Sequence, residues 1–152
     1  YVSWFPYIVV CAALAIKNLD DRQFKKAVLV LTTGMNIFLF ISYVWPTGLD
    51  LRESIVYDLH TLSGNLLKFV QTVDTPKSVF PSMHVYVTLV LQYTLEMQKK
   101  LVPSWGIWVG RVLAVLIVLS TMFTKQHSVL DVSAAIVMFA VLVVVVEKIV
   151  KK

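Results

Sequence analysis

Residues 129–146 have the sequence VLDVSAAIVMFAVLVVVV, in which Asp131 is the single charged residue. A helix that crosses the hydrocarbon core of a membrane needs about 20 mostly apolar residues, and this segment comes close to that length. Valine-rich segments favour strands in water, but a backbone inside lipid must satisfy its own hydrogen bonds, which favours a helix. The segment therefore predicts a membrane-spanning α-helix.

Four further apolar segments share this character and occupy residues 2–16, 27–45, 80–95 and 105–123. Hydrophobic residues make up 58% of the chain and charged residues only 15%, whereas about a quarter of a soluble domain is charged. This composition argues against a soluble enzyme, a disordered tail and a nucleic-acid-binding domain. We therefore predict an all-α, multi-pass transmembrane helical bundle with five spans, forming one membrane-embedded domain over residues 1–152.

The basic residues indicate how this bundle is oriented in a cell membrane. Alternate connections place most of them at one end, which holds Lys17, Arg22, Lys25, Lys26, Lys99, Lys100, Lys148, Lys151, Lys152 and, by snorkelling, Arg111. Cytoplasmic connections are enriched in Lys and Arg, so the N-terminus is expected outside and the C-terminus inside. An outside N-terminus without a leader is expected of a chain that lacks an upstream span. The net charge of +5 is then a topology signal and does not indicate a nucleic-acid partner.

The longest connection, residues 46–79, lies on the outer side in this topology. Its apolar residues recur at three- and four-residue spacing, at Leu51, Ile55, Leu59, Leu62, Leu66 and Val70. Charged residues fall between them. This pattern predicts an amphipathic helix that lies on the outer membrane surface.

Three ionisable residues are expected to gather at the outer end of the bundle. His84 lies near the start of the 80–95 segment, and His127 opens the 129–146 segment. Asp131 follows His127 by one helical turn on the same face. The interval between the two histidines is about what two crossings of about 20 residues and a tight turn require. Both histidines should therefore return to the same depth.

Asp131 has apolar neighbours, and a carboxylate at mid-helix costs about 2.5 to 3.5 kcal/mol to insert into a membrane. Two interpretations of this residue are open. In the first, Asp131 lies at a shallow depth and pairs with Lys125 or with a helix cap. In the second, it holds and orients the ring of His127, as a carboxylate does in catalytic relays.

The start of the 80–95 segment also has the features of an anion site. Pro81 suits the first helical turn, and Ser82 can cap the helix or donate its hydroxyl. The free N–H groups and the dipole at a helix N-terminus favour phosphate. Three cations expected on this face could hold phosphate oxygens: Arg52, Lys77 and Lys125. The plainer interpretation of both lysines is contact with solvent or lipid headgroups.

These residues resemble two motifs of the type 2 phosphatidic acid phosphatase superfamily, which includes the lipid phosphate phosphatases. The family's Pro-Ser-x-His motif corresponds to Pro81-Ser82-Met83-His84. Its later motif, Ser-Arg, five residues, His, three residues and Asp, corresponds to Ser120-Thr121, His127 and Asp131. The resemblance covers about residues 1–150 and implies a six-span core of which the first span is missing here.

The resemblance implies covalent catalysis at the outer leaflet on a phosphomonoester or pyrophosphate of a lipid. His127 would be the nucleophile that forms a phosphohistidine, and Asp131 would orient it and stabilise its charge. His84 would protonate the leaving alcohol and then act as the base for the acceptor. Ser82 would bind phosphate. The family needs no metal and no other cofactor.

Two departures from the family pattern bear on the reaction. Thr121 replaces the arginine of the later motif, and an earlier motif, a lysine, six residues and Arg-Pro, is not intact. If Arg52 is that arginine, Trp45 replaces the lysine and Glu53 the proline. Lysines on the same face would then supply the missing positive charge. A missing arginine also resembles the inositol phosphorylceramide and sphingomyelin synthase branch, which passes a phospho-headgroup to a lipid alcohol.

Two other functions remain open for the same residues. A non-enzymatic, proton-coupled transporter subunit would use His84, His127 and Asp131 as a proton path. A metal site would use the two imidazoles and the carboxylate as ligands.

Overall fold

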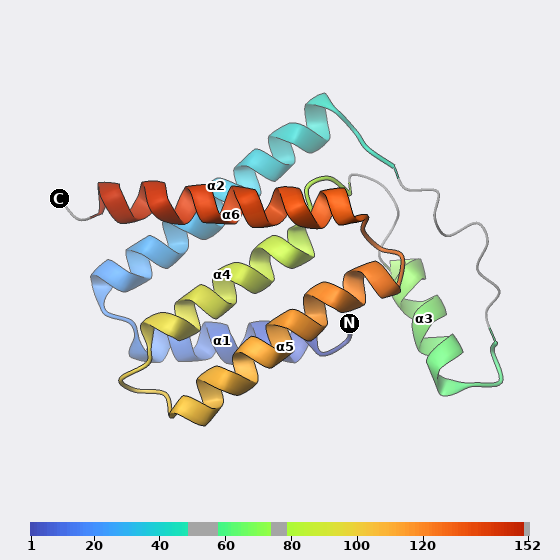
Figure 1. The fold of residues 1–152 in the computed structure, drawn as a ribbon, viewed down its shortest axis with the longest axis horizontal. Helices are drawn as coiled ribbons and strands as arrows, with labels where there is room; N and C mark the ends of the chain where they lie inside the picture. Colours follow the sequence, from blue (N-terminus) through green and yellow to red (C-terminus); the bar gives the residue numbers. More distant parts are fainter. Residues whose placement is uncertain (49–57, 74–78, 151–152) are drawn as a thin grey trace.

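The computed structural model describes residues 1–48, 58–73 and 79–150, and six α-helices form the regular structure of these ranges. In chain order they are α1 (Trp4–Asn18), α2 (Asp21–Val44), α3 (Leu62–Val73), α4 (Met83–Met97), α5 (Ser104–Phe123) and α6 (Val129–Ile149). Figure 1 shows α1, α2, α4, α5 and α6 as a bundle, with α3 beyond the end at which α4 and α6 begin. The predicted all-α fold is confirmed.

The central helix of the bundle is α4, which contacts α1, α2, α5 and α6 (Figure 1). Its residues Val85 and Tyr86 are fully buried, and Val90 is almost so. Val132 and Ala135 of α6 belong to the same buried cluster. The helix that carries His84 is therefore held by four neighbouring helices.

Gly34 allows α2 to approach α4 closely. A Cβ atom on Gly34 would lie 2.1 Å from Cζ of Tyr86, far inside van der Waals contact. The hydroxyl of Tyr86 donates a hydrogen bond to the carbonyl oxygen of Val30 at 2.6 Å. The missing side chain of Gly34 thus makes room for this buried ring.

Three helices, α2, α5 and α6, are long and apolar enough to cross a membrane, judged by length and composition. α1 is a shorter apolar helix, and α4 has 15 residues. A helix of that length spans about 22 Å, against a hydrocarbon core of about 30 Å. Large apolar side chains such as Leu39, Leu116 and Val137 are exposed on the outside of the bundle. Three of the five predicted spans therefore have the length and the outward faces that lipid requires.

Helix caps place two helix starts away from the predicted ones. α2 begins at Asp21 rather than at residue 27, because Asp20 caps it in a capping box. α4 begins at Met83 rather than at residue 80, because Ser82 is its N-cap residue. Pro81 therefore precedes the helix, and its predicted place in the first helical turn is wrong.

The surface helix α3 is shorter than the predicted amphipathic helix. Leu59 precedes it in a turn, and Leu51 and Ile55 lie outside the described residues. Most of the side chains of α3 are exposed. Near its end, Nε2 of Gln71 donates to the carbonyl oxygen of Thr124 at 2.7 Å, which attaches α3 to the turn between α5 and α6.

Ionic contacts connect the helices at the opposite end of the bundle. Nζ of Lys26 in α2 lies 2.6 Å from Oε2 of Glu147 in α6. The hydroxyl of Tyr93 in α4 donates to the other oxygen of the same carboxylate at 2.6 Å. Nε of Arg111 in α5 lies 2.6 Å from Oε1 of Glu96 in α4. Lys26 and Arg111, both predicted on the cytoplasmic side, thus lie at the end remote from His84.

Candidate functional site

Two histidines from distant parts of the chain meet where α4 and α6 begin. His84 is in the first turn of α4, and His127 lies in the turn that leads into α6. Nδ1 of His84 lies 3.3 Å from Nε2 of His127, and the ring centroids are 5.6 Å apart. His127 is only 7% exposed, and His84 is half-buried. The structure thus brings together the two histidines whose spacing predicted a common depth.

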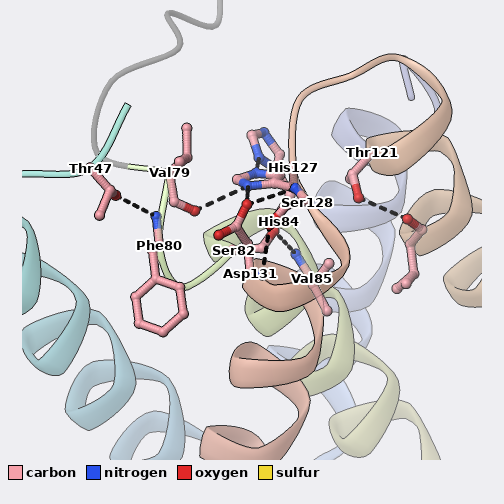
Figure 2. A network of polar contacts seen from close by, with 11 residues as sticks. Thr47, Val79, Phe80, Ser82, His84, Val85, Thr121, His127, Ser128 and Asp131 are labelled. Atoms are coloured by element: carbon pink, nitrogen blue, oxygen red, sulfur yellow. Dashed lines mark hydrogen bonds and ion pairs between the residues drawn. The ribbon is translucent and has the colours of Figure 1, made fainter. Parts of the chain in front are cut away.

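The carbonyl oxygen of Val79 fixes the tautomer of neutral His127. It lies 3.1 Å from Nδ1 of that ring. Because a carbonyl oxygen only accepts, Nδ1 carries the proton and donates it, which leaves the lone pair of the neutral ring on Nε2. Nε2 is the nitrogen that faces His84, so His84 donates to it from Nδ1. Figure 2 shows these contacts meeting at the ring of His127.

His84 has a further contact at its other nitrogen. The hydroxyl of Tyr1 lies 2.7 Å from Nε2 of His84. Since the proton of a neutral His84 is on Nδ1, the Tyr1 hydroxyl donates to Nε2. Tyr1 could not be predicted as part of the site from the sequence, because its contact depends on how α1 packs against α4 and no local motif marks it.

Asp131 caps α6 and also lies beside His127. Its Oδ2 accepts a hydrogen bond from the backbone N–H of Ser128 at 2.7 Å, and Oγ of Ser128 accepts one from the N–H of Asp131 at 3.3 Å. This is a capping box, and it satisfies a carboxylate that is only 5% exposed. Oδ2 is 3.9 Å from Nδ1 of His127, beyond hydrogen-bond distance. The carboxylate is thus a cap and a neighbouring charge, while Val79 holds the ring.

A backbone hydrogen bond joins the two helix starts. The N–H of Ser82 donates to the carbonyl oxygen of Asp131 at 3.1 Å. Ser82 is fully buried, and its Oγ accepts the N–H of Val85 at 3.3 Å as the cap of α4. The positive ends of two helix dipoles therefore meet beside the histidines, an arrangement that favours a bound anion.

Thr121 supports the turn between α5 and α6. Its carbonyl oxygen accepts hydrogen bonds from the N–H groups of Gln126 at 2.9 Å and His127 at 3.2 Å. Its hydroxyl, drawn with this contact in Figure 2, donates to the carbonyl oxygen of Val118 at 2.8 Å. The residue is fully buried. Thr121, which stands where the resembled motif has arginine, therefore holds the backbone that carries His127.

One of the three predicted phosphate-binding cations lies in the same turn. Lys125 is half-buried and has a φ of 53°, in the left-handed region that a residue with a long side chain rarely adopts. Its place two residues before His127 brings its backbone next to the site. Arg52 and Lys77 lie outside the described residues.

Within residues 1–48, 58–73 and 79–150, no three or more His, Cys, Asp or Glu side chains are grouped in a way that could hold a metal ion. The metal-site alternative therefore has no set of ligands in this part of the chain. No protein-family model, curated protein or solved structure matches the chain. The chemical interpretation accordingly depends on the geometry of the histidine pair.

Proposed function

We propose that the chain is an integral membrane lipid phosphatase that hydrolyses a phosphomonoester or pyrophosphate of a lipid at the outer leaflet. The observation that carries this proposal is the pair of imidazoles, in which Nε2 of His127 lies 3.3 Å from Nδ1 of His84. The first nitrogen has a lone pair and the second a proton. Phosphoryl transfer through a covalent intermediate needs a nucleophile and an acid that face each other across the phosphoryl group, and these two nitrogens face each other directly.

In the first half-reaction, the lone pair on Nε2 of His127 attacks phosphorus while the bond from phosphorus to the ester oxygen breaks. A bound phosphate dianion favours the imidazolium form of His84, which then gives its Nδ1 proton to the leaving oxygen. The phosphoryl group takes the place of the direct contact between the two rings. The leaving alcohol departs neutral, and the phosphoryl group stays on His127.

In the second half-reaction, neutral His84 takes a proton from water at Nδ1 as the water oxygen attacks phosphorus. The bond between phosphorus and nitrogen breaks, and its electron pair returns to Nε2 of His127. Val79 keeps the proton on Nδ1 throughout, so the same nitrogen is nucleophile and leaving group. Water and ester are thereby converted into alcohol and inorganic phosphate, in two steps that are each easier than direct displacement.

The electrostatics around the rings support the same reaction. The starts of α4 and α6 are joined by the Ser82–Asp131 hydrogen bond of 3.1 Å, so two helix dipoles favour the phosphate anion. Lys125 belongs to the turn before His127 and is the cation we assign to phosphate binding. The carboxylate of Asp131, 3.9 Å from Nδ1 of His127, stabilises the positive charge of the phosphorylated ring.

We place α2, α5 and α6 across the bilayer as three of five spans, with α1 and α4 completing the bundle. Exposed apolar side chains on the outside of the helices support this placement. Lys26 and Arg111 at the end remote from the histidines support a cytoplasmic position for that end. The histidine pair is then at the extracytoplasmic side.

Transfer of a phospho-headgroup to a lipid alcohol is a second candidate function, and it shares the first half-reaction. The observation that favours it is Thr121, which is buried and bonded to its own helix where the phosphatase motif has arginine. A proton-coupled transporter is less well supported. Its proton path would use His84, His127 and Asp131, but Oδ2 of Asp131 lies 3.9 Å from Nδ1 of His127, beyond hydrogen-bond distance.

Inorganic phosphate released from lipid phosphates by the purified protein in vesicles tests the proposal. His127→Asn should lower kcat by roughly three or more orders of magnitude while the protein still inserts and folds. His60→Asn, at an exposed histidine in the turn before α3, is the matched control. Near-normal hydrolysis by His127→Asn would reject the proposal. With a diacylglycerol or ceramide acceptor present, a phosphorylated acceptor in place of free phosphate would favour the transferase.

The leaving group separates the roles of the two histidines. An aryl phosphate releases an acidic phenol that needs no protonation. His84→Asn should therefore lower kcat for an alkyl phosphate by about 10²- to 10⁴-fold, and it should lower kcat for the aryl phosphate much less. Equal losses on both substrates would contradict the role of His84 as the acid.

A further inference from the structure

A cavity of about 310 Å³ lies between α1, α2 and α4 and is bordered by His84. Its other walls are apolar and are formed by Trp4, Met35, Phe38, Leu39, Met83 and Val87. Met35 is 42% exposed and Leu39 is 61% exposed, so the cavity opens at the periphery of the bundle, where the hydrocarbon of a bilayer would lie. Because the proposed reaction needs His84 beside the leaving oxygen, the leaving group is directed to this cavity.

Trp4 adds a hydrogen-bond donor at the same place. Its ring centroid is 4.6 Å from that of His84. Its Nε1 is buried and has no hydrogen-bond partner among the described residues. An indole N–H only donates, and a buried donor without an acceptor is costly. An oxygen of a phosphoester next to His84 is an acceptor of the kind that this N–H requires.

We propose that this cavity holds hydrocarbon attached directly to the phosphoester oxygen, so that the leaving group is a long-chain or isoprenoid monoalcohol. Trp4 donates to an oxygen of the phosphoester. The proposal rests on the proposed function and narrows its substrate class. Of the residues that line the cavity, only His84 and Trp4 carry polar side-chain atoms. Hydroxyls or ester carbonyls next to the leaving oxygen would be buried there without partners, whereas an alkyl or isoprenyl chain has none.

The volume of the cavity is suited to one hydrocarbon chain. Small-molecule sites occupy about 300 to 1,000 Å³, and this cavity lies at the lower end of that range. The opening beside Leu39 lets the rest of a long chain continue into lipid. A substrate of this class reaches the histidines sideways from the membrane.

The substrate class is tested by comparing kcat/KM for dodecyl phosphate and farnesyl phosphate with kcat/KM for dioleoyl phosphatidic acid, at equal surface concentrations in mixed micelles. We expect the two monoalcohol phosphates to react at least about tenfold more efficiently, a difference that contacts in an apolar pocket commonly supply. Equal values, or a preference for phosphatidic acid, would overturn the proposal. The proposed function would then still stand, because phosphate is released.

Substitutions test whether this cavity determines the preference for monoalcohol phosphates. Leu39→Trp should lower kcat/KM for dodecyl phosphate at least about tenfold, mainly through KM, and lower kcat/KM for a short aryl phosphate much less. Leu116→Trp, at an exposed leucine of α5 that does not line the cavity, is the matched control. Trp4→Phe keeps the ring without the N–H and should lower kcat/KM for alkyl and aryl phosphates alike. Unchanged kinetics in Leu39→Trp would overturn the assignment.

A binding measurement distinguishes failure of the cavity from failure of catalysis. With Trp45, Trp105 and Trp108 replaced by Phe, Trp4 is the one tryptophan left in the sequence. We expect saturable quenching of its fluorescence by a terminally brominated dodecyl phosphate, reversed by dodecyl phosphate but not by glycerol phosphate. Such quenching without phosphate release from any substrate would uphold the ligand class and reject the proposed function. Absence of saturable quenching would overturn the cavity proposal.

Discussion

The backbone N–H of Ser82 donates a hydrogen bond of 3.1 Å to the carbonyl oxygen of Asp131, which joins the cap of α4 to the first turn of α6. His84 follows Ser82 closely in the chain, and His127 precedes Asp131 by one helical turn. The positions of the two backbone segments that carry the imidazoles are therefore set relative to each other by this hydrogen bond. A phosphoryl-transfer site depends on such fixed geometry, because a misplacement of about 1 Å can cost about 10²-fold in rate.

Removal of the Ser82 hydroxyl separates helix capping from phosphate binding. Ser82→Ala should lower the free energy of unfolding by about 1 kcal/mol through loss of the N-cap, and it should also raise KM. Ser128→Ala removes the cap of α6 at a similar cost but not the proposed phosphate ligand. Thermal unfolding in detergent and steady-state kinetics measure the two effects. An equal rise of KM in both variants would show that Ser82 acts only as a helix cap and does not bind phosphate.

Asp131→Asn tests the charge of the carboxylate. Asparagine keeps an oxygen that can accept the N–H of Ser128, so the protein should fold, but the charge 3.9 Å from His127 is lost. We expect kcat for phosphate release to fall roughly 10- to 100-fold, as when other functional histidines lose an outer partner. The decrease in kcat should not be larger, because the carbonyl oxygen of Val79 still holds the ring of His127. An unchanged kcat would show that Asp131 serves only the cap.

Lys125 combines a left-handed backbone with a charge, and two substitutions separate these properties. Lys125→Asn tolerates the φ of 53° but is neutral, whereas Lys125→Arg keeps the charge. We expect KM for an anionic substrate to rise in Lys125→Asn by about tenfold, as for one lost charge-assisted contact of about 1.4 kcal/mol, and to change little in Lys125→Arg. Initial rates over a range of substrate concentrations give the comparison. Equal KM values in the two variants would assign Lys125 a backbone role alone.

Gly34→Ala should destabilise the bundle by about 1 to 3 kcal/mol, because its Cβ would overlap the buried ring of Tyr86. Gly106→Ala in α5 is the control. Its Cβ would lie 3.2 Å from Cγ1 of Val102, a much milder approach than the 2.1 Å at Gly34, and alanine favours the helix by up to about 1 kcal/mol. Thermal unfolding of both variants in one detergent measures the difference. A neutral Gly34→Ala would contradict the close approach of α2 and α4.

Vanadate and a chelator distinguish the phosphohistidine route from a metal-dependent one. Vanadate resembles the five-coordinate phosphorus of the transition state and should inhibit competitively, since transition-state analogues bind at least about 10²-fold more tightly than substrates. EDTA should leave the rate of phosphate release unchanged. Activity that is lost with EDTA and restored by a divalent cation would favour the metal site.

The long helices were predictable because hydropathy alone marks them. α2, α5 and α6 each contain an apolar run of the length that a bilayer imposes. The start of α4 was not predictable in the same way, because apolar residues continue upstream of it and only the cap formed by Ser82 ends the loop. The prediction of the surface helix was wrong at Leu59, where the apolar periodicity continues but the chain makes a turn.

Part of the site was also predictable. The span length fixes how far the chain travels between His84 and His127, so their spacing indicated that they would meet. The contacts of Val79 and Tyr1 with these rings could not be derived, because each depends on the path of a loop or the packing of α1. The cap formed by Asp131 was one of two interpretations, and spacing alone does not choose between them.

The contacts of Glu147 with Lys26 and Tyr93 fasten α2, α4 and α6 to one another at the end of the bundle remote from the histidines. The Ser82–Asp131 hydrogen bond joins α4 and α6 at the histidine end as well, so both ends of this helix pair are fastened. Room for a phosphoryl group between the imidazoles would therefore come from rotation of a side chain and not from separation of the helices. The half-buried ring of His84, which borders the cavity, is the one that would turn.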